Sequence, residues 1–101
     1  MNILICEPNV PPYEKKITGK YEELQQIIGA NMKVLSLNHP SIIIICNKDA
    51  YEKKSHSEYY RLNIPGTFLF SGHKNNRLRS LSEDEINVII NTIRKEDFTL
   101  V

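Results

Sequence analysis

Ser80–Lys95 reads S-L-S-E-D-E-I-N-V-I-I-N-T-I-R-K, and this stretch specifies a helix almost residue by residue. Ser82 can cap the first amides, while Glu85, three residues later, can reach back to the N–H of Ser82. Acidic residues follow the cap, basic residues close the segment, and apolar residues recur on one face. These apolar residues are Ile86, Ile89, Ile90 and Ile93. Such an apolar helix face is expected to pack against a sheet.

The run Ile42–Ile45 predicts a strand of that sheet. Its four consecutive isoleucines indicate burial on both faces, which is typical of a central strand. Met32–Leu37 comes before it across the turn Asn38–Ser41, so the two segments should form a hairpin. Other expected strands are Ile3–Cys6, Tyr59–Leu62 and Thr67–Phe70, and Tyr13–Thr18 is expected to be a short strand or an extended arm. The polar segments Asp49–Ser57 and His73–Arg79 are expected to be loops.

A second helix is expected at Tyr21–Ile28, because its apolar residues share one face and Gly29 is a usual helix terminator. The order of elements predicts one α+β domain over residues 1–101, with a mixed or antiparallel sheet of about four to five strands. Two helices should pack on it. We expect them to share one face of the sheet, which leaves the other face or the rim for a partner.

The composition limits the function classes. Thirteen basic and twelve acidic residues give a net charge of +1, which argues against direct binding of nucleic acid through a uniform field. No apolar segment predicts an export signal or a membrane span, so we expect a cytoplasmic protein. Cys6 and Cys46 lie in apolar runs and are expected to be buried, unreactive thiols.

The candidate binding residues lie in the span from Lys53 to Arg79. This span contains six basic residues and a single acidic residue. If the two polar loops converge at one end of the sheet, they form a basic rim that can receive phosphates or an acidic protein surface. The alternative is that these cations are ordinary solvated side chains. The residues proposed for this rim are Lys53, Lys54, Tyr59, Tyr60, Arg61, His73, Lys74, Arg77 and Arg79.

No pattern predicts catalysis, a metal or a cofactor. The three histidines, His39, His56 and His73, lie in separate turns and lack the spacing of a zinc site. Gly66 and Gly72 do not form a phosphate-binding loop. We therefore expect a protein that is not an enzyme.

Several segments together resemble a known family. In chain order they are I-L-I-C-E-P, P-P-Y-E-K-K-I, Y-E-E-L-Q-Q-I-I-G, I-I-I-I-C-N, I-P-G-T-F-L-F-S-G and S-L-S-E-D-E-I. The chain resembles a domain-of-unknown-function family, number 3846, of short proteins carried by phages, plasmids and integrated elements. The resemblance implies a mobile-element accessory protein and gives no reaction.

Three hypotheses of function follow. The leading one is an inhibitor that binds a bacterial immune or regulatory protein, of the anti-CRISPR or another anti-defence type. The second is a small-molecule binder that sequesters a phosphate-containing nucleotide signal, with a homodimer interface completing its pocket. The third is a small enzyme that acts on nucleotides. A stable complex with a large host protein would favour the first, and a phosphate-containing ligand between subunits would favour the second.

Overall fold

The computed structural model describes residues 1–8, 10–29, 31–37, 39–53, 60–61 and 64–95. The described helices are α1 (Tyr21–Ile28), α2 (Lys48–Lys53) and α3 (Glu83–Lys95). The strands are β1 (Asn2–Cys6), β2 (Tyr13–Lys16), β3 (Met32–Ser36), β4 (Ile42–Asn47), β5 (Tyr60–Arg61), β6 (Ile64–Pro65), β7 (Phe68–Lys74) and β8 (Arg77–Arg79). None of the described helices has the length and apolar character that a membrane crossing needs.

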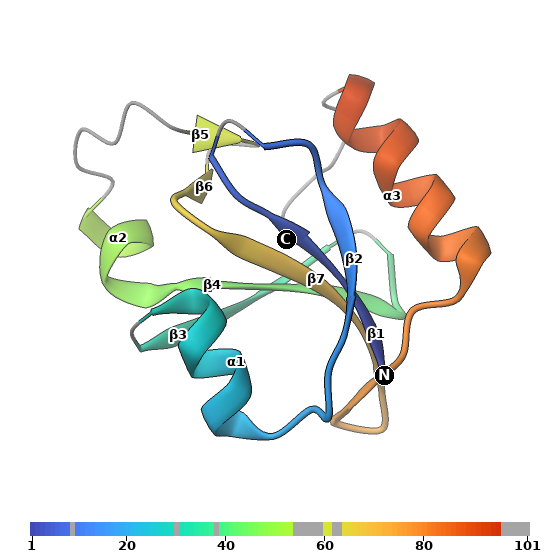
Figure 1. Ribbon diagram of the computed structural model, residues 1–101, viewed down its shortest axis with the longest axis horizontal. Coiled ribbons are helices and arrows are strands. Elements are labelled where there is room, and N and C mark those ends of the chain that lie inside the picture. Colours follow the sequence, from blue (N-terminus) through green and yellow to red (C-terminus); the bar gives the residue numbers. More distant parts are fainter. Residues whose placement is uncertain (9, 30, 38, 54–59, 62–63, 96–101) are drawn as a thin grey trace.

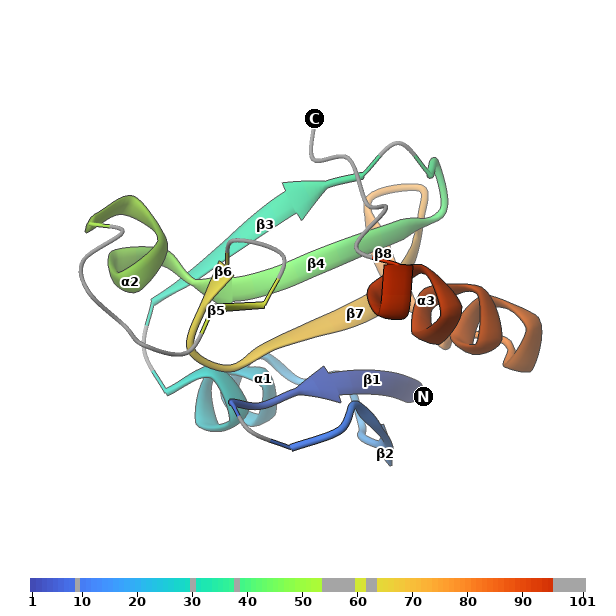
Figure 2. The ribbon, with the colours of Figure 1, turned by 90° about the horizontal axis from the view of Figure 1, so that it is seen from above.

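The main sheet is antiparallel, and its strands follow the order β2-β1-β7-β4-β3 (Figure 2). Strand β8 also pairs with β7, beyond the segment that pairs with β1, while β5 and β6 form a separate two-stranded sheet. The α+β fold with an antiparallel sheet is therefore confirmed. So is the hairpin of β3 and β4, and β4 lies inside the sheet with Ile42–Cys46 buried.

The helices lie on opposite faces of the sheet, and the expectation that they share one face is wrong. Helix α1 packs Leu24 and Ile28 against Ile3, Ile43 and other residues of one face. Helix α3 covers the other face with two isoleucines, Ile86 and Ile89, and with Leu81 just before its start. Neighbouring residues of each strand point to opposite faces, so a strand of consecutive apolar residues supplies a core to both helices. We call the two sides the α1 face and the α3 face.

Both helix termini that the sequence specified are present. The Ser82 Oγ accepts the N–H of Glu85 at 3.1 Å, and the Glu85 Oε1 accepts the N–H of Ser82 at 2.9 Å, which completes the capping box. Gly29 ends α1 with φ 89°, in the left-handed region that glycine adopts without a steric penalty.

Two expected loops instead contain regular structure. The segment 48–53 is the helix α2, because the Asn47 side-chain oxygen caps it by accepting the N–H of Ala50 at 3.0 Å. The segment 73–79 forms the end of β7, a two-residue turn and β8. Asn75 and Asn76 have φ of 54° and 62°, and asparagine tolerates this conformation in tight hairpin turns.

Candidate functional site

The expected basic rim is divided between the two ends of the sheet. Strand β4 runs from Ile42, which pairs with Gly72 near the β7–β8 hairpin, to Asn47, where α2 begins. The hairpin and α2 consequently lie at opposite ends of β4, as both views show (Figures 1 and 2). The described parts of the two segments do not converge, so the condition for a single basic rim is not met among the described residues.

At the α2 end, Lys53 lies in the last turn of α2, and Tyr60 and Arg61 form β5. Lys54, His56 and Tyr59 lie outside the described residues. At the other end, Lys74 and Arg77 pair across the β7–β8 hairpin and are exposed. The structure thus brings Lys74 and Arg77 together and separates them from Lys53 and Arg61.

Arg79 is engaged within the molecule. Its Nη1 and Nη2 donate to the two carboxylate oxygens of Glu85 at 2.8 Å and 2.6 Å. The same nitrogens donate to the backbone oxygens of Ser80 and Ser41 at 2.9 Å and 3.0 Å. The guanidinium therefore joins β8, the start of α3 and the turn before β4.

Gly72 makes room for this arrangement. A Cβ built at Gly72 would lie 2.6 Å from Nη1 and 2.7 Å from Cγ of Arg79. These separations are too short for any side chain at position 72 without displacement of the arginine. Gly72 and Arg79 therefore act as a structural pair, whereas the sequence analysis proposed Arg79 for partner binding.

His73 lies on the α1 face, next to a hollow of about 220 Å³ at the turn between β3 and β4. His39 lines the same hollow, and its Nδ1 accepts the N–H of Ser41 at 3.2 Å. The remaining walls are mainly apolar and include Val34, Pro40 and Ile43. Across the described ranges, no three His, Cys, Asp or Glu side chains gather in a way that could hold a metal ion.

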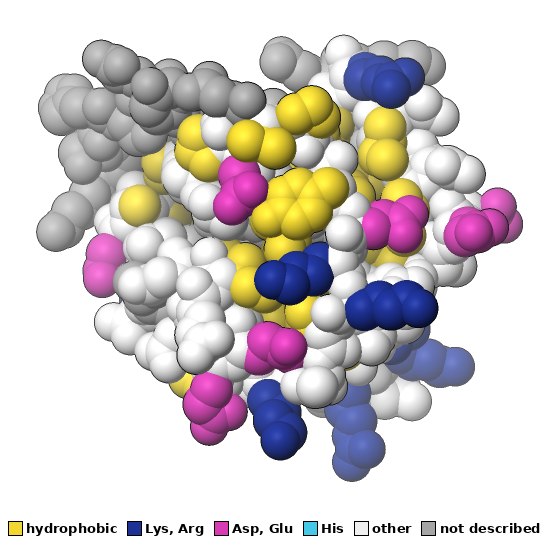
Figure 3. Space-filling view, in the orientation of Figure 1, with side chains coloured by type: hydrophobic (Ala, Val, Ile, Leu, Met, Phe, Trp, Pro, Cys, Tyr) yellow, Lys and Arg dark blue, Asp and Glu magenta, His cyan; other side chains and the backbone are white. Residues whose placement is uncertain are grey.

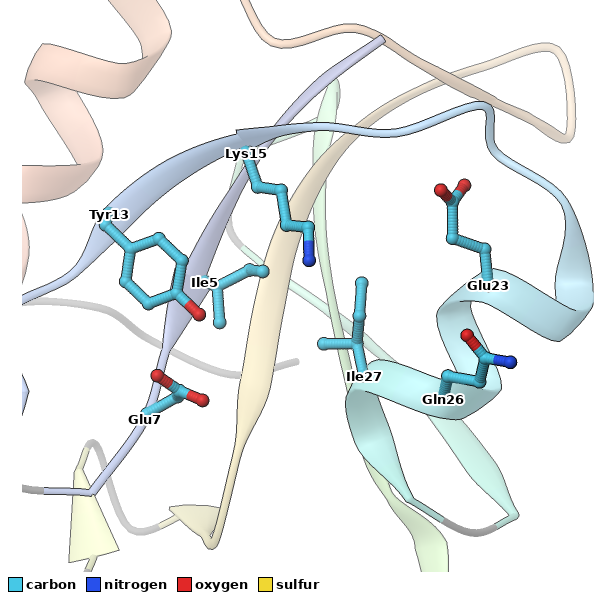
Figure 4. A pocket seen from close by; sticks show the side chains of 7 residues that line it. All are labelled: Ile5, Glu7, Tyr13, Lys15, Glu23, Gln26 and Ile27. Atoms are coloured by element: carbon cyan, nitrogen blue, oxygen red, sulfur yellow. The ribbon is translucent and has the colours of Figure 1, made fainter.

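A larger cleft, of about 320 Å³, lies between the β1–β2 hairpin and α1 (Figure 4). Tyr13 and Lys15 of β2 pair with Ile5 and Ile3 of β1, so they point to the α1 face. Ile5 and Ile27 supply apolar surface between the two walls. The lining residues are Ile5, Glu7, Tyr13, Lys15, Glu23, Gln26 and Ile27.

One side of the cleft carries a hydrogen-bonded pair, in which the Tyr13 hydroxyl approaches the Glu7 carboxylate (Figure 4). Partial burial, then the hydrogen bond to Glu7 and its negative charge, raise the pKa of Tyr13 above its ordinary value. The tyrosine therefore stays protonated and can donate its hydrogen bond. Its side chain is 37% exposed, so the ring is accessible from solvent.

On the other side of the cleft, Glu23 of α1 binds the residues just before the helix. Its Oε1 accepts hydrogen bonds from the backbone N–H and the hydroxyl of Thr18 and from the N–H of Gly19, at 2.7, 2.8 and 3.2 Å. The Thr18 hydrogen bonds, with help from Gly19 and the charge of Lys15, lower the pKa of Glu23. These contacts fix the start of α1 relative to the end of β2, and so they fix the width of the cleft.

The cleft combines opposite charges with apolar surface. Glu7 and Glu23 face a single ammonium, that of Lys15, so the lining carries a formal excess of one negative charge. In the space-filling view, hydrophobic atoms near the middle of the molecule are flanked by acidic and basic side chains (Figure 3). Sequence reasoning missed this site. The placement of Tyr13 and Lys15 two residues apart could have indicated a shared face.

Comparison with known proteins identifies the family. A sequence model described as Domain of unknown function (DUF3846) matches residues 1–94. The chain belongs to the DUF3846 family. Searches of the curated proteins and of the solved structures gave no match. The DUF3846 match includes every residue that lines the cleft and the described strands from β1 to β8.

Proposed function

We propose that this DUF3846 protein is a non-enzymatic accessory protein of phages or other mobile elements that inhibits a bacterial immune or regulatory protein. It acts in the cytoplasm of the host cell by binding that protein through the cleft between β2 and α1. The observation that carries the proposal is the cleft itself, in which an accessible tyrosine and an apolar floor lie among charged side chains. The mobile-element setting follows from the family resemblance.

This composition is typical of a protein-binding surface. Tyrosine is enriched in interfaces because it offers a large apolar ring and a polar end, and interface centres are usually surrounded by polar groups. Tyr13 has this role in the cleft, and Tyr21 of α1, which is 58% exposed, adds a second accessible ring on the helix that forms the other wall. Lys15 supplies the one positive charge of the lining, so it favours a partner that presents a carboxylate to it and basic groups to Glu7 and Glu23.

The cleft is less suited to the alternative ligand, a nucleotide signal. Its volume is near the lower end of the range for small-molecule pockets, and two carboxylates would repel phosphate groups. Sequestration of a nucleotide, or an enzyme that acts on one, would need the cations outside the cleft, such as Lys74 and Arg77. Native mass spectrometry of the purified protein tests these alternatives, because a co-purified nucleotide would add a discrete mass.

The test of the main proposal uses two neighbouring lysines. Lys15 lines the cleft, whereas Lys16 is the next residue of β2 and points to the other face. Lys15→Glu and Lys16→Glu therefore make the same change of charge on opposite sides of one strand. Each variant carries a C-terminal tag, since the N-terminal amine donates to the Ile17 oxygen at 2.7 Å.

Capture from a bacterial lysate, followed by assay of the captured protein, gives the readout. We expect Lys15→Glu to weaken binding by about tenfold or more and to relieve inhibition of the captured protein, while Lys16→Glu keeps both. Equal losses in the two variants, or no loss in either, would place the interface elsewhere. Capture without any effect on the partner's activity would contradict the inhibitory role.

A further inference from the structure

Strand β3 forms one outer edge of the main sheet (Figure 2). The N–H of Lys48 donates to the oxygen of Asn31 at 2.8 Å, and the pairing continues from Met32 with Asn47 to Ser36 with Ile43. The pair of Asn31 and Lys48 is thus a hydrogen-bonded pair. Because hydrogen-bonded and non-hydrogen-bonded pairs alternate in an antiparallel ladder, the backbone groups of Lys33 and Leu35 bond to β4. Met32, Val34 and Ser36 therefore direct their backbone N–H and C=O groups away from β4.

The side chains along this edge are mostly uncharged. Val34 is 57% exposed and lies at the centre of β3, although it is apolar. The one lysine, Lys33, places its Nζ 5.8 Å from the ring centroid of Tyr51. The opposite edge of the sheet, β2, is different, since its sequence Y-E-K-K is exposed throughout and its charges discourage pairing with another strand.

We propose that the β3 edge is a dimer interface, in which β3 of a second copy of this chain pairs antiparallel around a two-fold axis at Val34. The proposal is independent of the cleft and of the partner described above. Val34 then faces Val34 of the copy, and Met32 faces Ser36 of the copy, so the outward N–H and C=O groups of each pair are satisfied. The two sheets become one continuous sheet.

The charges are compatible with this register. Lys33 lies opposite Leu35 of the copy, so no lysine faces a lysine directly. The two valines form a β-branched cross-strand pair on the α1 face, which is a favourable pair in antiparallel sheets. Self-complementarity of this kind is what a two-fold interface requires, because both copies contribute the same patch.

The hollow of about 220 Å³ on the α1 face gives the interface a place for an apolar side chain. Ser36 and Val34 line this hollow together with Ile43 and Pro40. Met32 packs only partly against the core of its own chain, and since Met32 of the copy lies opposite Ser36, its side chain can extend into the hollow. Methionine is flexible and fills irregular apolar spaces well. The second copy therefore both continues the sheet and fills a cavity that the single chain leaves open.

Sedimentation velocity over a range of protein concentrations tests the interface. We expect the wild type to dimerise and Val34→Lys, which places two ammonium groups opposite each other, to raise the dissociation constant by about tenfold or more. Glu14→Lys is the matched control, because Glu14 directs its backbone outward on β2, the other edge, and should leave the dimer unchanged. A wild type that stays monomeric at its highest soluble concentration overturns the proposal.

A disulfide test checks the register and does not depend on the lysine variant. Val34→Cys brings two thiols together across the two-fold axis, at a spacing that a disulfide spans. Cys6 and Cys46 do not compete, since both are buried and burial raises the pKa of Cys46 to about 11. We expect Val34→Cys to form a linked dimer on mild oxidation much faster than Glu14→Cys. Equal rates for the two variants would overturn the assignment to β3.

Discussion

At the start of α3, Glu85 accepts hydrogen bonds from Arg79 and from the N–H of Ser82. The side-chain hydrogen bond from Arg79 is the largest cause that lowers the pKa of Glu85 from 4.5 to about 2, although partial burial opposes it. A lowered pKa means that the folded state favours the ionised carboxylate. The stabilisation is therefore fully present above pH 4.5 and is lost as the pH falls towards 2.

Glu85→Gln should lower the free energy of unfolding at pH 7 by about 1.5–3 kcal/mol, the usual range for hydrogen bonds to charged groups. The difference from the wild type should shrink as the pH is lowered from 4.5 towards 2, because the wild-type carboxylate becomes protonated there. Urea unfolding at a series of pH values measures both effects.

Glu83→Gln is the matched control, since Glu83 is an exposed acid in the same first turn. It should change the free energy of unfolding by less than about 0.5 kcal/mol, as exposed substitutions usually do. If Glu83→Gln and Glu85→Gln gave the same pH profile, the ion pair with Arg79 would not be the source of the stabilisation.

Among the elements, α1 and α3 are separated by the sheet, and each helix stabilises a different core cluster. Leu24 belongs to the cluster on the α1 face, which includes Ile3, Ile5 and Leu69. Ile89 belongs to the cluster on the α3 face and has no exposed surface. The two side chains therefore share no direct packing contact, in contrast to the expectation that both helices lie on one face.

Ile89→Ala should cost about 2–5 kcal/mol, and Leu24→Ala should fall in the same range, because each change leaves a cavity in a packed core. The double variant should cost the sum of the two within about 0.5 kcal/mol, as for sites without shared partners. Urea unfolding of the two single variants and the double variant measures the coupling. If the double variant is too unstable for measurement, Leu24→Val and Ile89→Val give a milder cycle.

Val88→Ala serves as the control for this cycle, because Val88 is next to Ile89 on α3 but is 52% exposed. It should cost less than about 0.5 kcal/mol. A coupling above about 1 kcal/mol between Leu24 and Ile89 would contradict the separation of the two clusters.

The sequence predicted those elements whose boundaries are encoded locally. The capping box of Ser82 and Glu85, the terminator Gly29 and the doubly buried run Ile42–Ile45 each act within a few residues, and the structure confirms all three. The face on which a helix packs is not encoded in this way. An amphipathic pattern shows that a helix needs apolar partners, but the path of the chain decides which face receives it.

The hairpin of β7 and β8 was missed for a different reason. Its turn residues, Asn75 and Asn76, can adopt positive φ, but the usual indication of such a turn is asparagine or aspartate followed by glycine. The flanking residues are largely charged, so the segment resembled a loop. Pairing with the end of β7 is what makes Arg77–Arg79 a strand.

For the whole molecule, a net charge near zero conceals an uneven distribution of cations. Lys74 and Arg77 lie together at one end of the sheet, whereas Arg79 is bound to Glu85. Hence the basic span contains exposed residues that can bind a partner and one residue that supports the fold. The cleft depends on three separate segments, β1, β2 and α1, and local sequence patterns could not reveal it.

The double variant Lys74→Ala and Arg77→Ala should leave the free energy of unfolding within about 0.5 kcal/mol of the wild type. The single variant Arg79→Ala should cost about 1–3 kcal/mol, since it leaves Glu85 without its charged partner. Urea unfolding distinguishes the two effects. If the double variant also weakens partner capture and reduces its dependence on salt, the exposed cations contribute to binding as well.

The comparison of the double variant with Arg79→Ala can contradict these roles of the three cations. A loss of stability in the double variant equal to that of Arg79→Ala would mean that the hairpin cations support the fold. Unchanged capture at all salt concentrations would mean that the exposed cations are solvated surface residues, and the cleft would remain as the candidate interface.

Strand β7 has one further consequence, for the order in which the chain can fold. The hairpins β1–β2 and β3–β4 are each local, but they share no strand, and among the described strands only β7 pairs with a member of both. During synthesis the two hairpins therefore wait for residues 68–74 to leave the ribosome before a single sheet can close. β1 lies more than sixty residues earlier in the chain than β7. Pairing of β7 with β1 therefore closes the longest loop of the sheet and accounts for most of its loop-closure entropy cost, so this step should limit the folding rate.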